Sequence, residues 1–150
     1  ALVHLLLHFR LLGAGKNELA LVVWVTLVGM VLDQLLFLLG VFNLSGQPAL
    51  APLWLACLWP VFATTLMHAF AMLRGRVVLA IAVGALGGAF SYMAGVRLSA
   101  VEFGAPVWGP FIVGATWAIL FPTLLLLATK FTVADDALQA WDPGAERALD

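Results

Sequence analysis

The stretch LALVVWVTLVGMVLDQLLFLLGVF, residues 19–42, contains one charged side chain, Asp33. About 20 apolar residues in a helix cross the roughly 30 Å hydrocarbon layer of a membrane, so this stretch is predicted to be a membrane span. An ionisable group at such a depth is costly and normally has a partner or a task. Asp33 is therefore the first candidate functional residue.

The whole chain has the composition of a membrane protein. It is 64% hydrophobic and 10% charged, with a mean hydropathy of +1.09, whereas an ordinary soluble domain is about 25% charged. The net charge of -1, without a basic cluster, argues against nucleic acid as a partner. Cys57 is the only cysteine, so the chain has neither an internal disulfide nor a cysteine-based metal site.

Three more segments have the length and composition of spans: residues 53–73, 77–96 and 107–129. Residues 1–9 are apolar but too short, and are expected to be the end of a span that begins earlier in a longer native chain. The predicted fold is all-α, a polytopic transmembrane bundle with four complete spans plus a partial N-terminal one. The bundle covers residues 1–130, and residues 131–150 form an acidic cytoplasmic tail.

Basic side chains predict the orientation of the bundle. By the positive-inside rule, the junctions that carry them face the cytoplasm, while residues 43–52 and 98–106 face outward with Arg97. The side chains on the predicted cytoplasmic side are Arg10, Lys16, Arg74, Arg76 and Lys130.

Helical phase predicts which faces meet protein. At 100° per residue, Asp33 shares a face with the small residues Thr26 and Gly29 and is expected to point inward. Thr64 and His68 are likewise expected inward, with Trp59 on the opposite, lipid-facing side. Proline at positions 60 and 122 removes one helical hydrogen bond each and predicts a bend in two spans.

The span over residues 77–96 carries a ridge of small residues that lets another helix approach closely. This packing can occur within the chain or between copies of it, so a homo-oligomer through this face is one of two expectations. The ridge consists of Ala80, Gly84, Gly88, Ser91 and Gly95.

Counting depth from the cytoplasmic ends at about 1.5 Å per residue separates two polar layers. Asp33 and Tyr92 fall at one level, with Ser91 nearby and Arg97 as a counter-charge from the outward end. Three interpretations of this layer remain open: a structural hydrogen bond or ion pair that locks helix register, a proton-coupled or ligand-binding carboxylate, and an outward water-filled vestibule.

The second layer contains the three histidines of the chain. His4 and His8 lie four residues apart on one helical face, near the predicted depth of His68. Together they predict a low-specificity metal site, with packing histidines as the default. No carboxylate is expected near them.

Motifs of soluble enzymes are missing. The chain has no glycine-rich phosphate loop between a strand and a helix, and no nucleophile elbow. No cofactor is expected, and an enzyme is less favoured than a non-enzyme.

An ordered set of short motifs resembles a known family. They are G29-x-x-x-D33, A51-P-L-W54, T64-T-L-M-H68, G87-G-A-F-S-Y-M-A-G95-V-R97 and W117-x-x-x-F-P122. Over about residues 5–129 the chain is similar to the domain of unknown function 2878 family of small bacterial inner-membrane proteins. The resemblance implies a compact multi-pass protein of the bacterial inner membrane, and it transfers no catalytic residues.

The favoured function is a structural or accessory membrane component, for lipid or envelope maintenance, whose partners are membrane lipids. The first alternative is a small transporter or proton-coupled permease built around Asp33. The second is a metal-dependent lipid-modifying enzyme that uses His4, His8 and His68.

Overall fold

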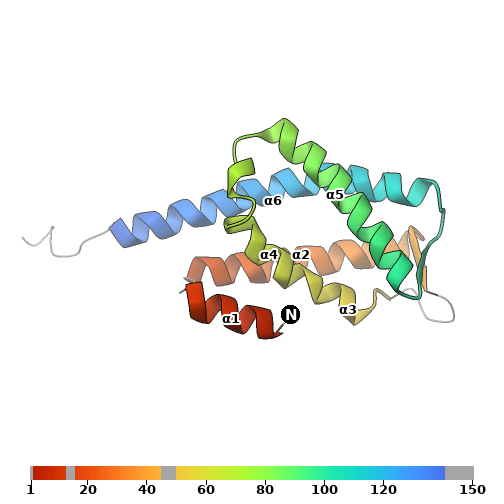
Figure 1. The fold of residues 1–150 in the computed structure, drawn as a ribbon, viewed down its shortest axis with the longest axis horizontal. Helices are drawn as coiled ribbons and strands as arrows, with labels where there is room; N and C mark the ends of the chain where they lie inside the picture. Colours follow the sequence, from red (N-terminus) through yellow and green to blue (C-terminus); the bar gives the residue numbers. More distant parts are fainter. Residues whose placement is uncertain (1, 13–15, 45–49, 141–150) are drawn as a thin grey trace, which may run out of the picture.

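The computed structural model describes residues 2–12, 16–44 and 50–140 and consists of two layers of helices. In one layer, α2 (Lys16–Leu38) and α6 (Trp108–Ala140) lie side by side. In the other, α4 (Leu58–Met67) packs against α2, and α5 (Val77–Leu98) packs against α6 (Figure 1). The strongest helix contact is therefore between α5 and α6, which are consecutive helices of the chain.

Smaller elements complete the two ends of the bundle. β1 (Phe42–Leu44) and β2 (Val101–Phe103) pair antiparallel, with Asn43 opposite Glu102, at the end where α2 and α5 finish. This short ribbon joins the two loops that are predicted to face outward. α1 (Leu2–Leu12) packs beside α4. α3 (Leu53–Ala56) precedes α4, and the 3-10 helix η1 (Ala71–Leu73) follows it.

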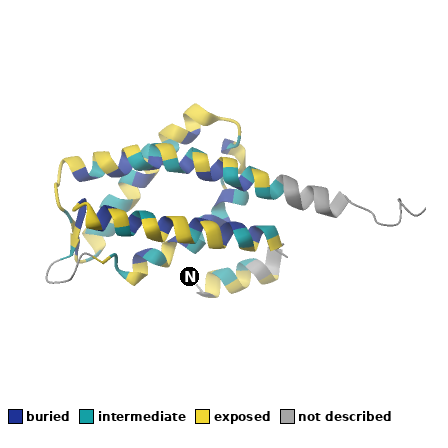
Figure 2. Ribbon diagram, turned by 180° about the vertical axis from the view of Figure 1, so that it is seen from behind, coloured by how far each residue is buried: buried dark blue, intermediate teal, exposed yellow. Residues whose placement is uncertain are grey.

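Among the residues that the structure describes, three helices are long and apolar enough to cross a membrane: α2, α5 and residues 108–132 of α6. Their outward surfaces carry large apolar side chains, including Trp24, Val78 and Phe111, which are 58%, 82% and 68% exposed. Figure 2 shows such exposed residues along the outer sides of the helices. Water would penalise this much contiguous apolar surface, whereas lipid does not. The chain has the surface of a multi-pass membrane protein.

The predicted span over residues 53–73 is not one long helix. The helix is interrupted at Cys57, and α4 ends at Met67. Pro60 has no N–H to donate to the Ala56 carbonyl, which explains the interruption. At about 1.5 Å per residue, the 10 residues of α4 reach only about half of the hydrocarbon thickness. The prediction of four complete spans is not confirmed.

The side chain of Arg74 closes the end of α4. Its Nη2 atom donates to the carbonyl oxygens of Leu66 and Met67, at 3.4 and 3.0 Å. The last carbonyls of a helix have no partner within it, and a cation at this end also interacts favourably with the helix dipole. Arg74 therefore stabilises the C-terminal end of α4, which lies before the end of the predicted span.

α6 is longer than the predicted last span. It contains Pro122 in its interior and continues past Lys130 to Ala140. The predicted boundary between bundle and tail, at residues 130 and 131, thus falls inside a helix. Residues 141–150 of the predicted acidic tail lie outside the described residues.

The small-residue ridge of α5 packs within the chain. A Cβ atom at Gly84 would meet the Trp117 carbonyl oxygen and Phe121, and one at Gly88 would overlap the Trp117 side chain. Ala80 is 2% exposed. Contact with α6 therefore accounts for this part of the ridge, and a homo-oligomer through it stays a prediction.

Candidate functional site

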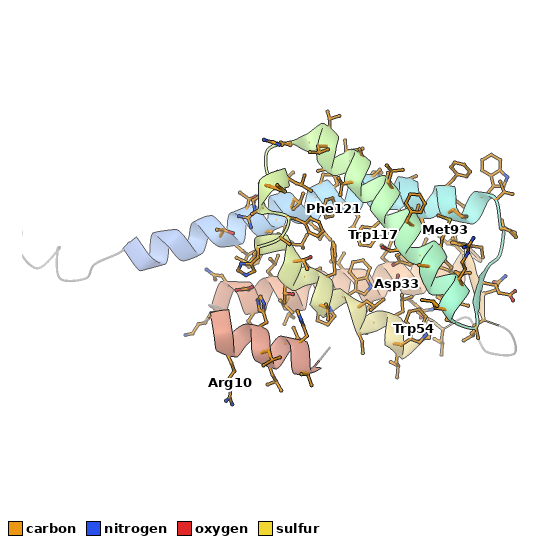
Figure 3. All side chains as sticks on the ribbon, viewed as in Figure 1. Arg10, Asp33, Trp54, Met93, Trp117 and Phe121 are labelled. Atoms are coloured by element: carbon orange, nitrogen blue, oxygen red, sulfur yellow. The ribbon has the colours of Figure 1, made fainter. Side chains whose placement is uncertain are left out.

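An aromatic groove lies between α4 and α5, the two helices that do not pack closely on each other. It encloses a cavity of about 310 Å³. Figure 3 shows Trp117 and Phe121 of α6 in the space between these helices. We call this feature the aromatic groove; its main lining residues are Trp59, Phe62 and Phe70 after α3, Gly84, Gly87, Gly88 and Tyr92 of α5, and Trp117 and Phe121 of α6.

Stacked rings form the floor of the aromatic groove. The rings of Trp59 and Trp117 are parallel, with centroids 5.4 Å apart and an interplanar angle of 6°. Phe62 meets Trp117 edge to face, with centroids 5.2 Å apart. Such offset and edge-to-face pairs add attraction beyond the area they bury. The floor is thus a rigid aromatic surface rather than flexible aliphatic chains.

Glycines leave space on the α5 side of the aromatic groove. Gly88 packs against the Trp117 ring, but a Cβ atom at the neighbouring Gly87 would meet nothing within 4 Å. Both glycines line the cavity. The G87-G88 pair therefore has two tasks, since one glycine allows close helix packing and the other leaves the cavity open.

Asp33 lies behind this floor and is 1% exposed. The indole Nε1 of Trp59 donates to its Oδ2 atom at 2.6 Å, and the hydroxyl of Tyr92 donates to its Oδ1 atom at 2.5 Å. The three residues belong to α2, α4 and α5. We call this arrangement the Asp33 clasp, because one carboxyl group ties three helices together.

The contact between Asp33 and Tyr92 was expected from helix phase and depth, and it is present. Trp59, however, does not face lipid as predicted; it is 3% exposed and is the second partner of Asp33. A Cβ atom at Gly29 would overlap the Trp59 ring. Gly29, one turn before Asp33, thus provides the slot for this ring and was the available signal in the sequence.

Two other residues expected near Asp33, Arg97 and Ser91, have different environments. Within the described part of the chain, Arg97 forms no ion pair, and its side chain is exposed. Ser91 is also exposed and lines the aromatic groove. Thr26, which was expected on the same face of the helix as Asp33 but not at its depth, donates to the Val22 carbonyl oxygen of its own helix at 2.7 Å. A Cβ atom at Gly95, in the small-residue ridge of α5, would lie 3.7 Å from the Trp54 ring.

A second polar cluster joins α1, the start of α2 and the segment after α4. The Oε1 atom of Glu18 lies 2.6 Å from His8 Nε2 and 3.0 Å from His68 Nε2. Glu18 is 5% exposed. The side chain of His8 is 7% exposed and that of His68 is 48% exposed, so the cluster is open on one side only. His68 is therefore less buried than predicted.

The three histidines do gather, but Glu18 is part of the cluster and His4 is not. His4 stacks on His8 with ring centroids 6.0 Å apart, while its Nε2 atom lies 3.0 Å from Thr64 Oγ1. Because the Thr64 hydroxyl donates to the Val61 carbonyl oxygen, His4 must be the donor to Thr64.

The expectation that no carboxylate lies near the histidines was wrong. Glu18 precedes the apolar stretch by one residue, and the structure includes it in the first turn of α2. Acidic residues are favoured in the first turn of a helix, where the dipole is positive. This preference was the signal in the sequence, although it does not predict that the side chain turns toward His8 and His68.

Helices long enough to span a membrane, with exposed apolar outer surfaces, define a multi-pass helical membrane protein. The chain belongs to the family described as protein of unknown function (DUF2878), which matches over residues 1–123. The family resemblance seen in the sequence is thereby confirmed. No curated protein matches the chain, and no solved structure does so either.

Proposed function

We propose that the protein is an accessory component of the bacterial inner membrane that binds one hydrocarbon chain of a membrane lipid in the aromatic groove. The observation that carries the proposal is the cavity of about 310 Å³ between α4 and α5. Ligand pockets in proteins begin at about this size and are mostly apolar. In this proposal the ends of the bundle rich in Arg and Lys face the cytoplasm.

The rim of the aromatic groove supports a lipid rather than a water-soluble ligand. Leu58 and Trp54, which line the cavity, are 54% and 42% exposed. They lie opposite α5, which is long enough to span the membrane. An apolar rim beside a spanning helix favours entry of a lipid chain from the hydrocarbon layer. A hydrated pathway would instead need polar groups along its wall.

The Asp33 clasp argues against the permease alternative. A carboxyl group that carries protons or ions must exchange its partners during the cycle. Both oxygens of Asp33 are already occupied by donors from two different helices. Breaking either bond would leave a buried polar group unpaired. We therefore assign Asp33 a structural role behind the groove.

The test is photolabelling with a phospholipid that carries a diazirine in its acyl chain, on protein in nanodiscs. We expect labelled peptides from α6 around Trp117 and Phe121. Gly87→Phe fills the cavity without a backbone clash, since a Cβ atom there has open space, and should abolish this labelling.

The matched control is Val78→Phe, which adds the same ring on the same helix at a position that is 82% exposed. It should leave labelling of α6 unchanged. Equal labelling in the wild type and Gly87→Phe would contradict the proposal. A folded Gly87→Phe variant is recognised by unchanged thermal unfolding.

A further inference from the structure

The cluster of His8, Glu18 and His68 takes no part in the aromatic groove or the Asp33 clasp. We infer that it binds one divalent transition-metal ion of the zinc type. Two imidazole nitrogens and one carboxylate oxygen, with a further position open, form a ligand set that zinc uses in proteins. This inference is independent of lipid binding in the groove.

The three ligand atoms converge on one point. One ligand atom from each of His8, Glu18 and His68 lies within 4.8 Å of the other two. Zinc bonds to nitrogen and oxygen are about 2.0–2.2 Å long, which puts tetrahedral ligand atoms roughly 3.3 Å apart. Binding would move the carboxylate oxygen outward by a fraction of an ångström from the two imidazole nitrogens, which lie at 2.6 and 3.0 Å. It would also draw together the ligand atoms that are farthest apart, which lie within 4.8 Å of each other.

The charges of the cluster also favour a cation. Glu18 is 5% exposed. In the described part of the chain, its ion-pair partners are only histidines, with no Lys or Arg. A buried carboxylate needs a compensating charge because burial removes its hydration. A divalent ion supplies that charge while both imidazoles stay neutral, which is their metal-binding form.

The site is open to solvent on the side of His68. This side chain is 48% exposed, whereas those of His8 and Glu18 are 7% and 6% exposed. A metal ion held here can keep a water molecule at its fourth position and exchange with solvent from that side. Because the ligands come from α1, α2 and the end of α4, the ion would also fasten α1 to the bundle.

His4 lies beside this site but is not one of its ligands. It stacks on His8 at 6.0 Å, and its Nε2 atom bonds to Thr64. A ligand set made of the three histidines would require His4 to leave Thr64. The proposed set of His8, Glu18 and His68 requires no such change, and the two sets make different predictions for Glu18 and His4.

The experiment is a zinc titration of the metal-stripped, detergent-solubilised full chain by calorimetry, with cobalt absorption as the spectroscopic readout. We expect one ion per chain and a tetrahedral cobalt spectrum. Glu18→Gln and His68→Ala should each lose stoichiometric binding. His4→Ala should retain it, because His4 is not a ligand.

Absence of zinc and cobalt binding to the wild type would overturn the inference, and the cluster would then be a carboxylate paired with histidines. Unchanged affinity in Glu18→Gln would overturn the ligand set. Lipid photolabelling of Glu18→Gln provides the folding control, because the groove shares no residue with this site. Loss of zinc binding with normal labelling leaves the proposed function intact.

Discussion

Trp59 links the buried carboxyl group to the candidate lipid site. Its ring occupies the slot at Gly29 and stacks on Trp117, while its Nε1 atom donates to Asp33. The phase of an unbroken helix predicted the opposite orientation. Helical phase takes no account of hydrogen bonding. It therefore could not predict that the indole N–H of Trp59 bonds to the buried Asp33 carboxyl group. Tyr92 was predicted correctly because a polar hydroxyl at the depth of Asp33 has few other partners.

The first prediction at the residue scale concerns this N–H. Trp59→Phe keeps an aromatic ring but leaves Asp33 Oδ2 without its donor. An unpaired buried acceptor costs about 1–3 kcal/mol, so the free energy of unfolding should fall by about this amount. Unfolding in mixed detergent micelles measures the change.

The control for this variant is Trp24→Phe, at a side chain that is 58% exposed. It removes an indole N–H of the same type without disturbing the Asp33 clasp, and should change the free energy of unfolding by less than about 0.5 kcal/mol. Equal losses in the two variants would mean that the hydrogen bond to Asp33 contributes nothing specific.

At the scale of elements, small residues determine how closely helices approach. The sequence predicted that the ridge of α5 serves close packing, and left its partner open. The structure assigns this face to α6 through Trp117 and Phe121. No count of glycines could decide this, because a neighbouring helix and a second chain offer the same apolar surface.

The adjacent glycines Gly87 and Gly88 of α5 should differ in how substitution by alanine changes the stability of the protein. Gly88→Ala places a methyl group into the Trp117 ring and should destabilise the protein by about 1–3 kcal/mol, as overpacking does. Gly87→Ala meets open space and should be neutral or stabilising by up to about 1 kcal/mol, since alanine favours helix over glycine.

Thermal unfolding of both variants in the same detergent provides the comparison. If Gly88→Ala were neutral for unfolding but changed the mass of the particle in native mass spectrometry, the ridge would serve an interface between copies. Similar values for the two variants would contradict the packing of α5 on α6.

The ends of α4 could not be predicted from hydropathy. Residues 53–73 are mostly apolar and contain no Asp, Glu, Lys or Arg, which predicted a full span, yet α4 ends at Met67. The local cause of the end is specific: Phe70 N–H bonds to the Thr65 carbonyl, and Arg74 closes the last turn. Hydropathy averages over such contacts and therefore extends the helix past its end.

At the scale of the whole molecule, the chain crosses the bundle repeatedly and brings its loops to two opposite ends. The ribbon of β1 and β2 marks one end, and the turn through Arg76 into α5 marks the other (Figure 1). Because α5 joins the two ends, a label at each of its flanks reports on opposite sides of the membrane.

The prediction that the two flanks of α5 lie on opposite sides of the membrane is tested by cysteine labelling in a Cys57→Ser background. A cysteine at Ala100, next to the ribbon, should react with a membrane-impermeant maleimide in intact cells, since both flanks are exposed. The variant Arg76→Cys should react only after the membrane is opened, because the positive-inside rule predicts that the basic junctions face the cytoplasm.

Two outcomes would contradict this topology in different ways. Reaction of both positions from the same side would mean that α5 does not cross the membrane. Reaction with the two sides exchanged would preserve the span and overturn the orientation inferred from the basic residues.

The sequence by itself determined the class of the protein, the helical state of its apolar stretches and the contact of Asp33 with Tyr92. These properties follow from the bilayer. Lipid offers the backbone no hydrogen-bond partners, so each segment must satisfy its own, and a carboxyl group is energetically unfavourable there unless it has a partner. Only the tertiary structure decided that Trp59 is the second partner of Asp33, that Glu18 joins His8 and His68, and that a groove remains between α4 and α5. Lipid is equally favourable to every apolar face, so the rotation and spacing of helices depend on shape, on which ring fits against which glycine and which donor reaches which acceptor.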